Sequence, residues 1–248
     1  MFFIIDEKNK ICYGWSAKSG CTHVKNILNF LIYNIHVLKN EDEFKDPKWL
    51  QQIPLIEKDG EKKIDISYKI IIVSRNPFER LVSGFKYKRK SMGKTFNHIK
   101  PFSFEFLVNE LFNNGIADSK YPNGKINRHH FTQQFSEAWT PLIDTLNPNI
   151  FKIMDIKNID YSFLENIYKK KIPYEFIQYK GEQNVSSNTL LKPYTGKNAY
   201  KLHIDKILEY DVKPHQLYNK NLYTKVKQFY EKDLILFKTY GLDYDILF

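Results

Sequence analysis

The sequence predicts an α/β fold in which a central parallel sheet is flanked by helices. Short runs of β-branched residues alternate along the chain with stretches whose apolar residues recur at helical spacing. The run over residues 69–74, KIIIVS, is apolar almost throughout and is typical of a central strand covered on both faces. Two such runs lead through a short loop into a helix, which favours parallel strands joined by crossover helices.

Length and composition favour a single domain over residues 1–248. Hydrophobic residues make up 42% of the chain, enough for a substantial core. The formal net charge of +10 favours anionic ligands such as nucleotides, acidic glycans, nucleic acid or anionic lipid, although a general richness in lysine explains part of it. Cys12 and Cys21 are too few for a disulfide scaffold and are not spaced as metal ligands, so we expect a reducing compartment and no metal.

The chain begins with two apolar runs, residues 2–5 and 11–15, which surround a polar turn and predict a β-hairpin. The first run is too short for a signal peptide or a membrane span, so we expect a chain that does not span a membrane. A loop over residues 16–20 follows. The apolar residues from Val24 to Ile35 then fall on one face of a predicted helix.

A second junction of strand and helix follows the run at residues 69–74. Residues 40–68 precede it and are rich in charge, which predicts loops and short helices that reach over a ligand. After the strand, Asn76 is a good N-cap, Pro77 suits the first helical position and Glu79 places an acid in the first turn. The remaining predictions are helices over 101–112, 161–170 and 217–237, a strand within 147–154 and a polar loop over 181–200.

The loop at residues 16–20 has the residue types of an anion site. Gly20 lets backbone amides approach a phosphate, Lys18 supplies a mobile cation and Thr22 a hydroxyl, at the start of a helix whose first amides attract anions. The lysine precedes the glycine, so the full GxxxxGK[ST] pattern of nucleoside triphosphatases is missing. A nucleotide-dependent phosphotransferase of the P-loop type remains an alternative.

The second junction adds an arginine and a hydroxyl. Arg75 ends the strand, and Ser83 follows the cap Asn76 by almost two helical turns, so that Arg75 and Ser83 could grip one phosphate monoester. Further cations predict a basic surface nearby: Arg80, Lys86, Lys88, Arg89, Lys90 and Lys94. A basic nucleic-acid-binding protein is therefore a second alternative, although a solvated helix face explains this run more simply.

Both junctions resemble a known family. Residues 15–22, WSAKSGCT, resemble the 5'-phosphosulfate loop of sulfotransferases, with carbohydrate sulfotransferases of the HNK-1 and chondroitin type (sulfotransferase family 2) as the nearest group. Residues 71–85, IIVSRNPFERLVSGF, are similar to that family's 3'-phosphate motif, with Asn76 in place of the usual acid. Weaker likenesses continue to Gly241. The resemblance implies a P-loop-like three-layer fold in one sulfotransferase domain.

The resemblance also implies a reaction, the transfer of a sulfuryl group from 3'-phosphoadenosine 5'-phosphosulfate (PAPS) to an acceptor hydroxyl. The residues expected to bind this donor are Lys18, Ser19, Gly20, Cys21, Thr22, Arg75 and Ser83. Lys18 is expected to be the principal electrostatic catalyst, because charge develops on the departing phosphate. His130 is the expected general base, since it matches the histidine of the family's His-Trp/Phe-x-Pro-Gln segment, where Gln133 replaces the proline.

Other groups remain open as the base: His129, His98, His23, Glu105 and Glu137. A packing role is the preferred interpretation of His23, and a structural role is an alternative for His130. Family members that act on extracellular glycans carry a membrane anchor, whereas this chain begins at its first predicted strand, so we expect a cytoplasmic enzyme. The expected acceptor is a hydroxyl-bearing glycan, with no nucleic-acid partner and with residues 40–68 and 86–134 as acceptor walls.

Overall fold

A computed structural model of the chain describes residues 2–39, 55–58, 61–92, 102–114, 131, 133–135, 151–179 and 191–246. The chain divides into two compact units. Unit 1 comprises residues 1–75 and 134–188, and unit 2 comprises residues 76–133 and 189–248. The expected single domain over 1–248 stays a prediction.

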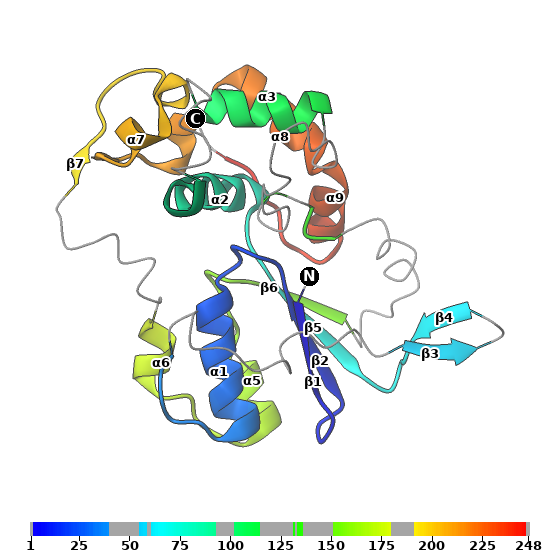
Figure 1. The fold of residues 1–248 in the computed structure, drawn as a ribbon. Coiled ribbons are helices and arrows are strands. Elements are labelled where there is room, and N and C mark those ends of the chain that lie inside the picture. Colours follow the sequence, from blue (N-terminus) through cyan, green and yellow to red (C-terminus); the bar gives the residue numbers. More distant parts are fainter. Residues whose placement is uncertain are drawn as a thin grey trace. The chain divides into compact units, whose positions relative to one another are not determined.

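A four-stranded sheet forms the centre of unit 1 (Figure 1). Its order is β1-β2-β5-β6, with bounds Phe2–Asp6, Ile11–Trp15, Lys69–Ser74 and Phe151–Asp155. β1 runs antiparallel to β2, whereas β2, β5 and β6 are parallel to one another. The α/β class is therefore confirmed, with a mostly parallel sheet whose edge is the predicted N-terminal hairpin.

Three helices pack on one face of this sheet (Figure 1): α1 (Cys21–Tyr33), α5 (Tyr161–Tyr168) and α6 (Tyr174–Gln178). α1 has the predicted amphipathic spacing. Asp160 is the N-cap of α5, and its side chain accepts a hydrogen bond from the N–H of Phe163 at 2.9 Å. The core between helices and sheet includes Ile4, Tyr13, Leu28, Phe30, Ile71, Val73, Met154, Leu164 and Phe176. Burial of these apolar groups stabilises unit 1.

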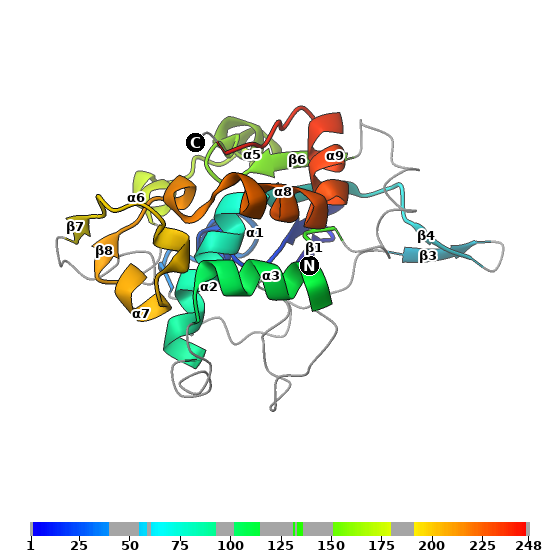
Figure 2. The ribbon, with the colours of Figure 1, turned by 90° about the horizontal axis from the view of Figure 1, so that it is seen from above.

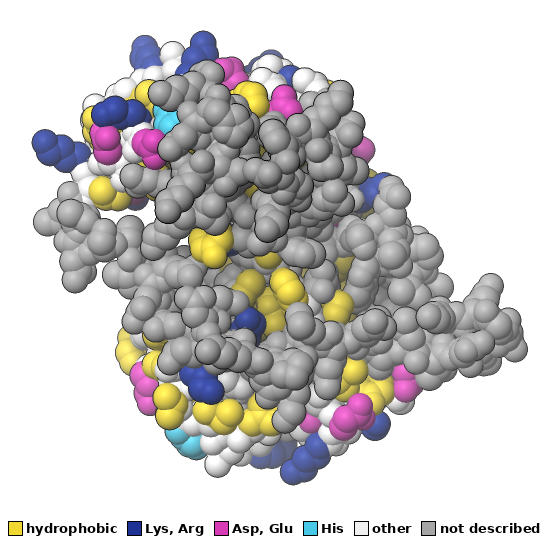
Figure 3. All heavy atoms as spheres, in the orientation of Figure 1, with side chains coloured by type: hydrophobic (Ala, Val, Ile, Leu, Met, Phe, Trp, Pro, Cys, Tyr) yellow, Lys and Arg dark blue, Asp and Glu magenta, His cyan; other side chains and the backbone are white. Residues whose placement is uncertain are grey.

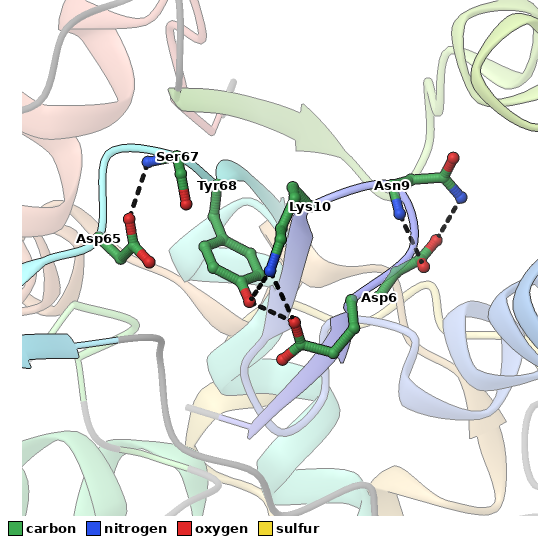
Figure 4. A network of polar contacts seen from close by, with 7 residues as sticks. Asp6, Asn9, Lys10, Asp65, Ser67 and Tyr68 are labelled. Atoms are coloured by element: carbon green, nitrogen blue, oxygen red, sulfur yellow. Dashed lines mark hydrogen bonds and ion pairs between the residues drawn. The ribbon is translucent and has the colours of Figure 1, made fainter.

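A polar network ties the hairpin turn to the start of β5 (Figure 4). Lys10 Nζ lies 3.0 Å from Glu7 Oε2 and 3.0 Å from the hydroxyl of Tyr68, which itself donates to Glu7. Within the turn, Asn9 Nδ2 donates to Asp6 Oδ2 at 2.8 Å. Because Tyr68 directly precedes β5, this network lies at the amino ends of β2 and β5.

A separate antiparallel hairpin is formed by β3 (Leu55–Lys58) and β4 (Glu61–Ile64). The prediction of loops and short helices is wrong for this part of residues 40–68. The missed signal is Asp59-Gly60 between the two strands, a pair typical of two-residue hairpin turns. Residues 40–54, which belong to the same predicted region, lie outside the described residues.

Helices predominate among the described residues of unit 2. They are α2 (Pro77–Met92), α3 (Phe104–Asn114), α7 (Ile204–Ile207), α8 (Lys220–Phe229) and α9 (Glu231–Thr239). α3 lies along α8 (Figures 1 and 2). The apolar faces of the helices of unit 2 enclose a second core, which includes Phe78, Leu81, Phe85, Phe104, Leu107, Leu222, Val226 and Tyr230.

The prediction of one helix over residues 217–237 is wrong. Leu217 ends the short 3-10 helix Pro214–Leu217, Asn219 caps α8, and the chain leaves helical geometry at Tyr230, with φ −103° and ψ 17°. The buried side chains Leu222 and Val226 lead on to Tyr230 at an unbroken spacing of four. Apolar periodicity therefore carries no sign of the interruption.

The polar loop predicted over residues 181–200 is also partly wrong. β7 (Lys192–Pro193) pairs in parallel with β8 (Tyr210–Asp211), and Ala199–Lys201 forms a 3-10 helix. A two-residue strand is too short for alternation to be detected in a sequence.

Charges of both signs are found on the described surface. On the face shown in Figure 3, Lys and Arg side chains of the described residues lie among Asp and Glu side chains. None of the helices in the described ranges is both long enough and apolar enough to cross a membrane.

Candidate functional site

The two predicted junctions meet at the carboxyl ends of β2 and β5. These strands are neighbours and parallel, and Trp15 pairs with Val73, so the segments that follow them leave the same edge of the sheet. There, Nη1 of Arg75 donates to the carbonyl oxygen of Lys18 at 3.2 Å. Within unit 1, the loop after β2 and the residue after β5 are therefore in contact.

The loop over residues 16–20 is a tight turn that leads into α1. The N–H of Ser19 donates to the carbonyl of Ser16 at 3.2 Å, and Lys18 and Gly20 have φ of 66° and 76°. The first bond of α1 joins the N–H of Val24 to the carbonyl of Gly20 at 3.0 Å. The start of an α-helix presents N–H groups that point away from the helix, and this arrangement attracts anions.

Gly20 is required at its position for two independent reasons. Its φ of 76° lies in the left-handed region that glycine adopts at little cost. A Cβ at residue 20 would also lie 2.5 Å from Cγ1 and Cδ1 of Ile156, which directly follows β6. The turn after β6 therefore forms a close wall behind the loop.

A buried neutral network lies beneath the loop. Oγ of Ser16 and Oγ of Ser19 are 2.7 Å apart, and they lie 3.1 Å and 3.0 Å from Oε1 of Gln134. The residues Ser19 and Gln134 are 0% and 3% exposed. The Ser19 hydroxyl is thus turned into the protein, and the predicted contact of Ser19 with the donor stays a prediction.

Gln134 was not predicted as a functional residue. It also binds the main chain of Arg75: its Oε1 accepts from the N–H at 3.2 Å and its Nε2 donates to the carbonyl at 2.8 Å. Gln134 stands 118 residues from Ser16 in the sequence, and the spacing of residues along one sequence does not predict so distant a contact. The only available signal was its position in the segment that contains His130.

The other predicted loop residues are partly accessible. Lys18, Cys21 and Thr22 are half-buried, and Sγ of Cys21 lies 3.5 Å from the carbonyl oxygen of Ser16. The loop thus offers a cation, a thiol and a hydroxyl beside the start of α1.

Ser83 lies on α2 in unit 2 and is half-buried. The predicted start of α2 is confirmed, because Oδ1 of Asn76 accepts a hydrogen bond from the N–H of Phe78 at 2.9 Å. Asparagine therefore caps this helix where the resembling family usually has an acid. Arg75 belongs to unit 1, so the joint grip of Arg75 and Ser83 on one phosphate stays a prediction.

The predicted basic surface on α2 is wrong at Arg80. This side chain is 0% exposed and interacts with the buried Tyr230, whose pKa is raised mainly by burial, is raised further by Asp233 and is lowered by Arg80. Lys86 is half-buried, and its Nζ donates to the carbonyl of Val212 at 2.6 Å. Burial lowers the pKa of Lys86. The side chains of the other predicted cations lie outside the described residues: Lys88, Arg89, Lys90 and Lys94.

Both ring nitrogens of His23 are occupied. Nδ1 lies 2.8 Å from the carbonyl oxygen of Tyr179, and Nε2 lies 2.9 Å from the hydroxyl of Tyr161. A carbonyl oxygen only accepts, so Nδ1 carries the hydrogen and Nε2 accepts from Tyr161. Burial raises the pKa of Tyr161, which keeps this donor protonated. The geometry agrees with a packing role for His23.

Of the other candidate bases, only Glu105 lies among the described residues. Glu105 is half-buried in the first turn of α3. The others lie outside the described residues: His98, His129, His130 and Glu137.

The cysteines differ in their surroundings. Cys12 is buried within β2, and burial raises the pKa of its thiol to about 12, so the thiol stays protonated. Within the described ranges, no group of three or more His, Cys, Asp or Glu side chains could hold a metal ion.

Comparisons with known proteins give one match. A family model described as the sulfotransferase family matches residues 1–241 and thus spans both junctions and Gln134. None of the curated proteins and none of the solved structures matches the chain.

Proposed function

The chain belongs to the sulfotransferase family, and from this premise we propose that it transfers a sulfuryl group from PAPS to an acceptor hydroxyl. The observation that carries the choice of donor is the hydrogen bond between Arg75 and the carbonyl of Lys18. It joins two loops that each suit an anionic group, as a donor with phosphates at both its 3' and 5' positions requires.

The donor site follows from the residues on these loops. The 5'-phosphosulfate binds at the start of α1, where Lys18, Gly20, Cys21 and Thr22 surround the helix amides, and Ser19 holds the loop in shape. The 3'-phosphate binds Arg75 together with Ser83, an arginine fork and a hydroxyl that suit a phosphate monoester.

The proposed mechanism is an in-line displacement. The acceptor oxygen forms a bond to sulfur as the bond from sulfur to the phosphate oxygen breaks, and negative charge grows on the departing bisphosphate. Nζ of Lys18 and the first amides of α1 stabilise that charge. The proton of the acceptor hydroxyl passes to His130 as general base.

The remaining parts of the proposal rest on the resemblance described above. A carbohydrate hydroxyl is the proposed acceptor, with residues 40–68 and 86–134 as its walls, and the proposed enzyme is a single cytoplasmic domain that needs no metal. No nucleic-acid partner is proposed, since Arg80 is buried and Lys86 is half-buried in the run that suggested one.

The donor assignment is tested by ligand-dependent thermal stability. At about 100 times its Kd, adenosine 3',5'-bisphosphate adds about 2.7 kcal/mol, which raises the melting midpoint by about 5–10 °C. AMP, which lacks the 3'-phosphate, should stabilise much less. Stabilisation by ATP with Mg²⁺ that equals that by the bisphosphate contradicts the donor assignment and favours a phosphotransferase.

The base is tested separately with His130→Ala. We expect transfer from PAPS to fall by about 10²–10⁴-fold while the affinity for adenosine 3',5'-bisphosphate stays near wild type, because the base acts on the acceptor. Transfer of labelled sulfate to a panel of sugars measures the first quantity and calorimetry the second. Unchanged turnover contradicts the role of His130.

A further inference from the structure

We propose that Gln134 is a positioning residue for the donor site, whose side-chain amide clamps the loop at residues 16–20 to the end of β5. The inference rests on the proposed PAPS site, because its effect is expressed as donor affinity. It assigns a role to a residue that touches neither the donor nor the reacting atoms.

The clamp consists of four contacts made by one side chain. Oε1 of Gln134 lies 3.1 Å from Oγ of Ser16, 3.0 Å from Oγ of Ser19 and 3.2 Å from the N–H of Arg75. Nε2 donates to the carbonyl of Arg75 at 2.8 Å. One buried amide therefore binds the segments that follow two adjacent strands.

The orientation of this amide is determined by its partners. A main-chain N–H only donates and a main-chain carbonyl only accepts, so Oε1 must face the N–H of Arg75 and Nε2 its carbonyl. The reversed amide would set donor against donor and acceptor against acceptor. A side chain with both an acceptor and a donor is needed at residue 134.

The serines need the same acceptor. The three oxygens of Ser16, Ser19 and Gln134 make three contacts, but the two hydroxyls supply only two hydrogens. Oε1 is the one oxygen of the three that brings no hydrogen and only accepts. Without it, one of the two hydroxyls must give its hydrogen to the other, whose own hydrogen then lacks this buried acceptor.

The clamp acts on the backbone that presents the donor-binding groups. Lys18 holds a left-handed φ of 66°, uncommon for a residue with a side chain, and such a conformation persists only where its surroundings enforce it. Hydrogen bonds from Ser16 and Ser19 to Gln134 hold the loop on one side. The hydrogen bond from Arg75 to the carbonyl of Lys18 holds it on the other. Loosening it displaces Lys18 and the start of α1 relative to Arg75.

The first test compares two neighbouring glutamines. Gln134→Met keeps the size of the side chain but removes the four contacts. Gln133→Met is the matched control, because Gln133 Nε2 also donates to a main-chain carbonyl, that of Phe229, at 2.8 Å. We expect Gln134→Met to bind adenosine 3',5'-bisphosphate about 10–100-fold more weakly than wild type. Gln133→Met should bind with near wild-type affinity, as measured by calorimetry on the full chain.

The second test uses pH. In Gln134→Glu, a carboxylate oxygen replaces the amide donor facing the carbonyl of Arg75, whereas the protonated acid again offers one donor and one acceptor. Burial raises the pKa of such an acid. We therefore expect the affinity deficit of Gln134→Glu relative to wild type to shrink as the pH falls from about 8 to 6, with no such recovery in Gln133→Glu.

The outcomes separate the clamp from the donor site. Wild-type protein that does not bind the bisphosphate refutes the proposed donor, and the clamp with it. Wild-type binding combined with unchanged affinity in Gln134→Met refutes the clamp alone. If Gln134→Met does not fold, the pH series of Gln134→Glu decides, and a deficit that does not vary with pH overturns the inference.

Discussion

The two ends of the sheet in unit 1 are held in different ways. At the amino ends of β2 and β5, the oppositely charged side chains of Glu7 and Lys10 bind each other and the hydroxyl of Tyr68 (Figure 4). At the carboxyl ends, the neutral groups of Ser16 and Gln134 bind each other and the main chain. One end is braced by exposed charge and the other by buried amides and hydroxyls.

At the carboxyl ends, the side chains that hold the loop in shape differ from Lys18 and Arg75, the side chains that we propose to bind the donor. Ser16, Ser19 and Gln134 are neutral, so these three side chains hold the loop without cancelling the charges of Lys18 and Arg75. None of these three side chains titrates near neutral pH, so the contacts among them do not depend on pH in that range. Exposed ion pairs contribute little to stability, whereas an unmade hydrogen bond in a buried site is costly.

The largest expected contrast is between one lysine at each end. Lys18→Met should lower the turnover of PAPS by about 10²–10³-fold, the usual cost of removing a group that stabilises developing charge. Lys10→Met should leave turnover near wild type, because Lys10 lies at the opposite end of the strands. Steady-state kinetics measure both, and equal losses in the two variants would remove the distinction between the ends.

A smaller effect is expected from the glycine behind the loop. Gly20→Ala combines an unfavourable φ with a Cβ 2.5 Å from Ile156, and should destabilise the protein by about 2–4 kcal/mol. Gly241→Ala is the control, since Gly241 has φ 79° and its Cβ would meet nothing within 4 Å. It should cost only about 1–2 kcal/mol. Denaturant titration measures the free energy of unfolding of both variants. Equal losses would mean that the Ile156 side chain moves away from the added Cβ at little cost.

The bracing at the amino ends predicts a modest effect for Tyr68→Phe. Loss of the hydroxyl removes its contacts with Glu7 and Lys10, so the melting midpoint should fall by about 2–4 °C. Affinity for adenosine 3',5'-bisphosphate should not change. Tyr174→Phe, at a tyrosine that is 72% exposed, is the matched control and should melt as wild type does. A change of donor affinity in Tyr68→Phe would contradict the view that the amino ends of β2 and β5 contribute to stability and not to donor binding.

The smallest expected effect is a pH dependence. Hydrogen bonds from Tyr68 and then from Lys10 hold the pKa of Glu7 below its ordinary value. A lowered carboxyl pKa adds stability above the unfolded-state pKa, and this is lost as the pH falls through the folded value. Melting midpoints of wild type and Glu7→Gln should therefore differ at neutral pH and converge below about pH 4. A difference that persists in acid, or one shared by Glu175→Gln, would contradict this.

Parts of both units could be predicted from the sequence because their signals are local. The β-branched run of β5 and the cap Asn76 each indicate an element boundary within a few residues. The break at Tyr230 could not be predicted, because the buried spacing of α8 and α9 runs through it. β7 is too short to show a pattern.

The site divides in the same way. Lys18 lies in the loop after β2 and Arg75 directly follows β5, so residue type and position along the chain were enough to select both as candidate site residues. Gln134 reaches the same place through tertiary structure, and its match to the glutamine of the family's His-Trp/Phe-x-Pro-Gln segment was the one sign that set it apart from Gln133. Burial was equally hidden for Arg80, since a charged residue on an amphipathic helix is expected to face solvent.

The hydrogen bonds from Gln134 to the main chain of residue 75 have a consequence for how the protein can evolve. A backbone N–H and a carbonyl are present whatever side chain residue 75 carries, proline excepted for the N–H. Substitutions at residue 75 can thus keep both hydrogen bonds from Gln134, although they remove the contact between the Arg75 side chain and the carbonyl of Lys18. Drift at Gln134 would instead alter the loop shape together with every contact that depends on it.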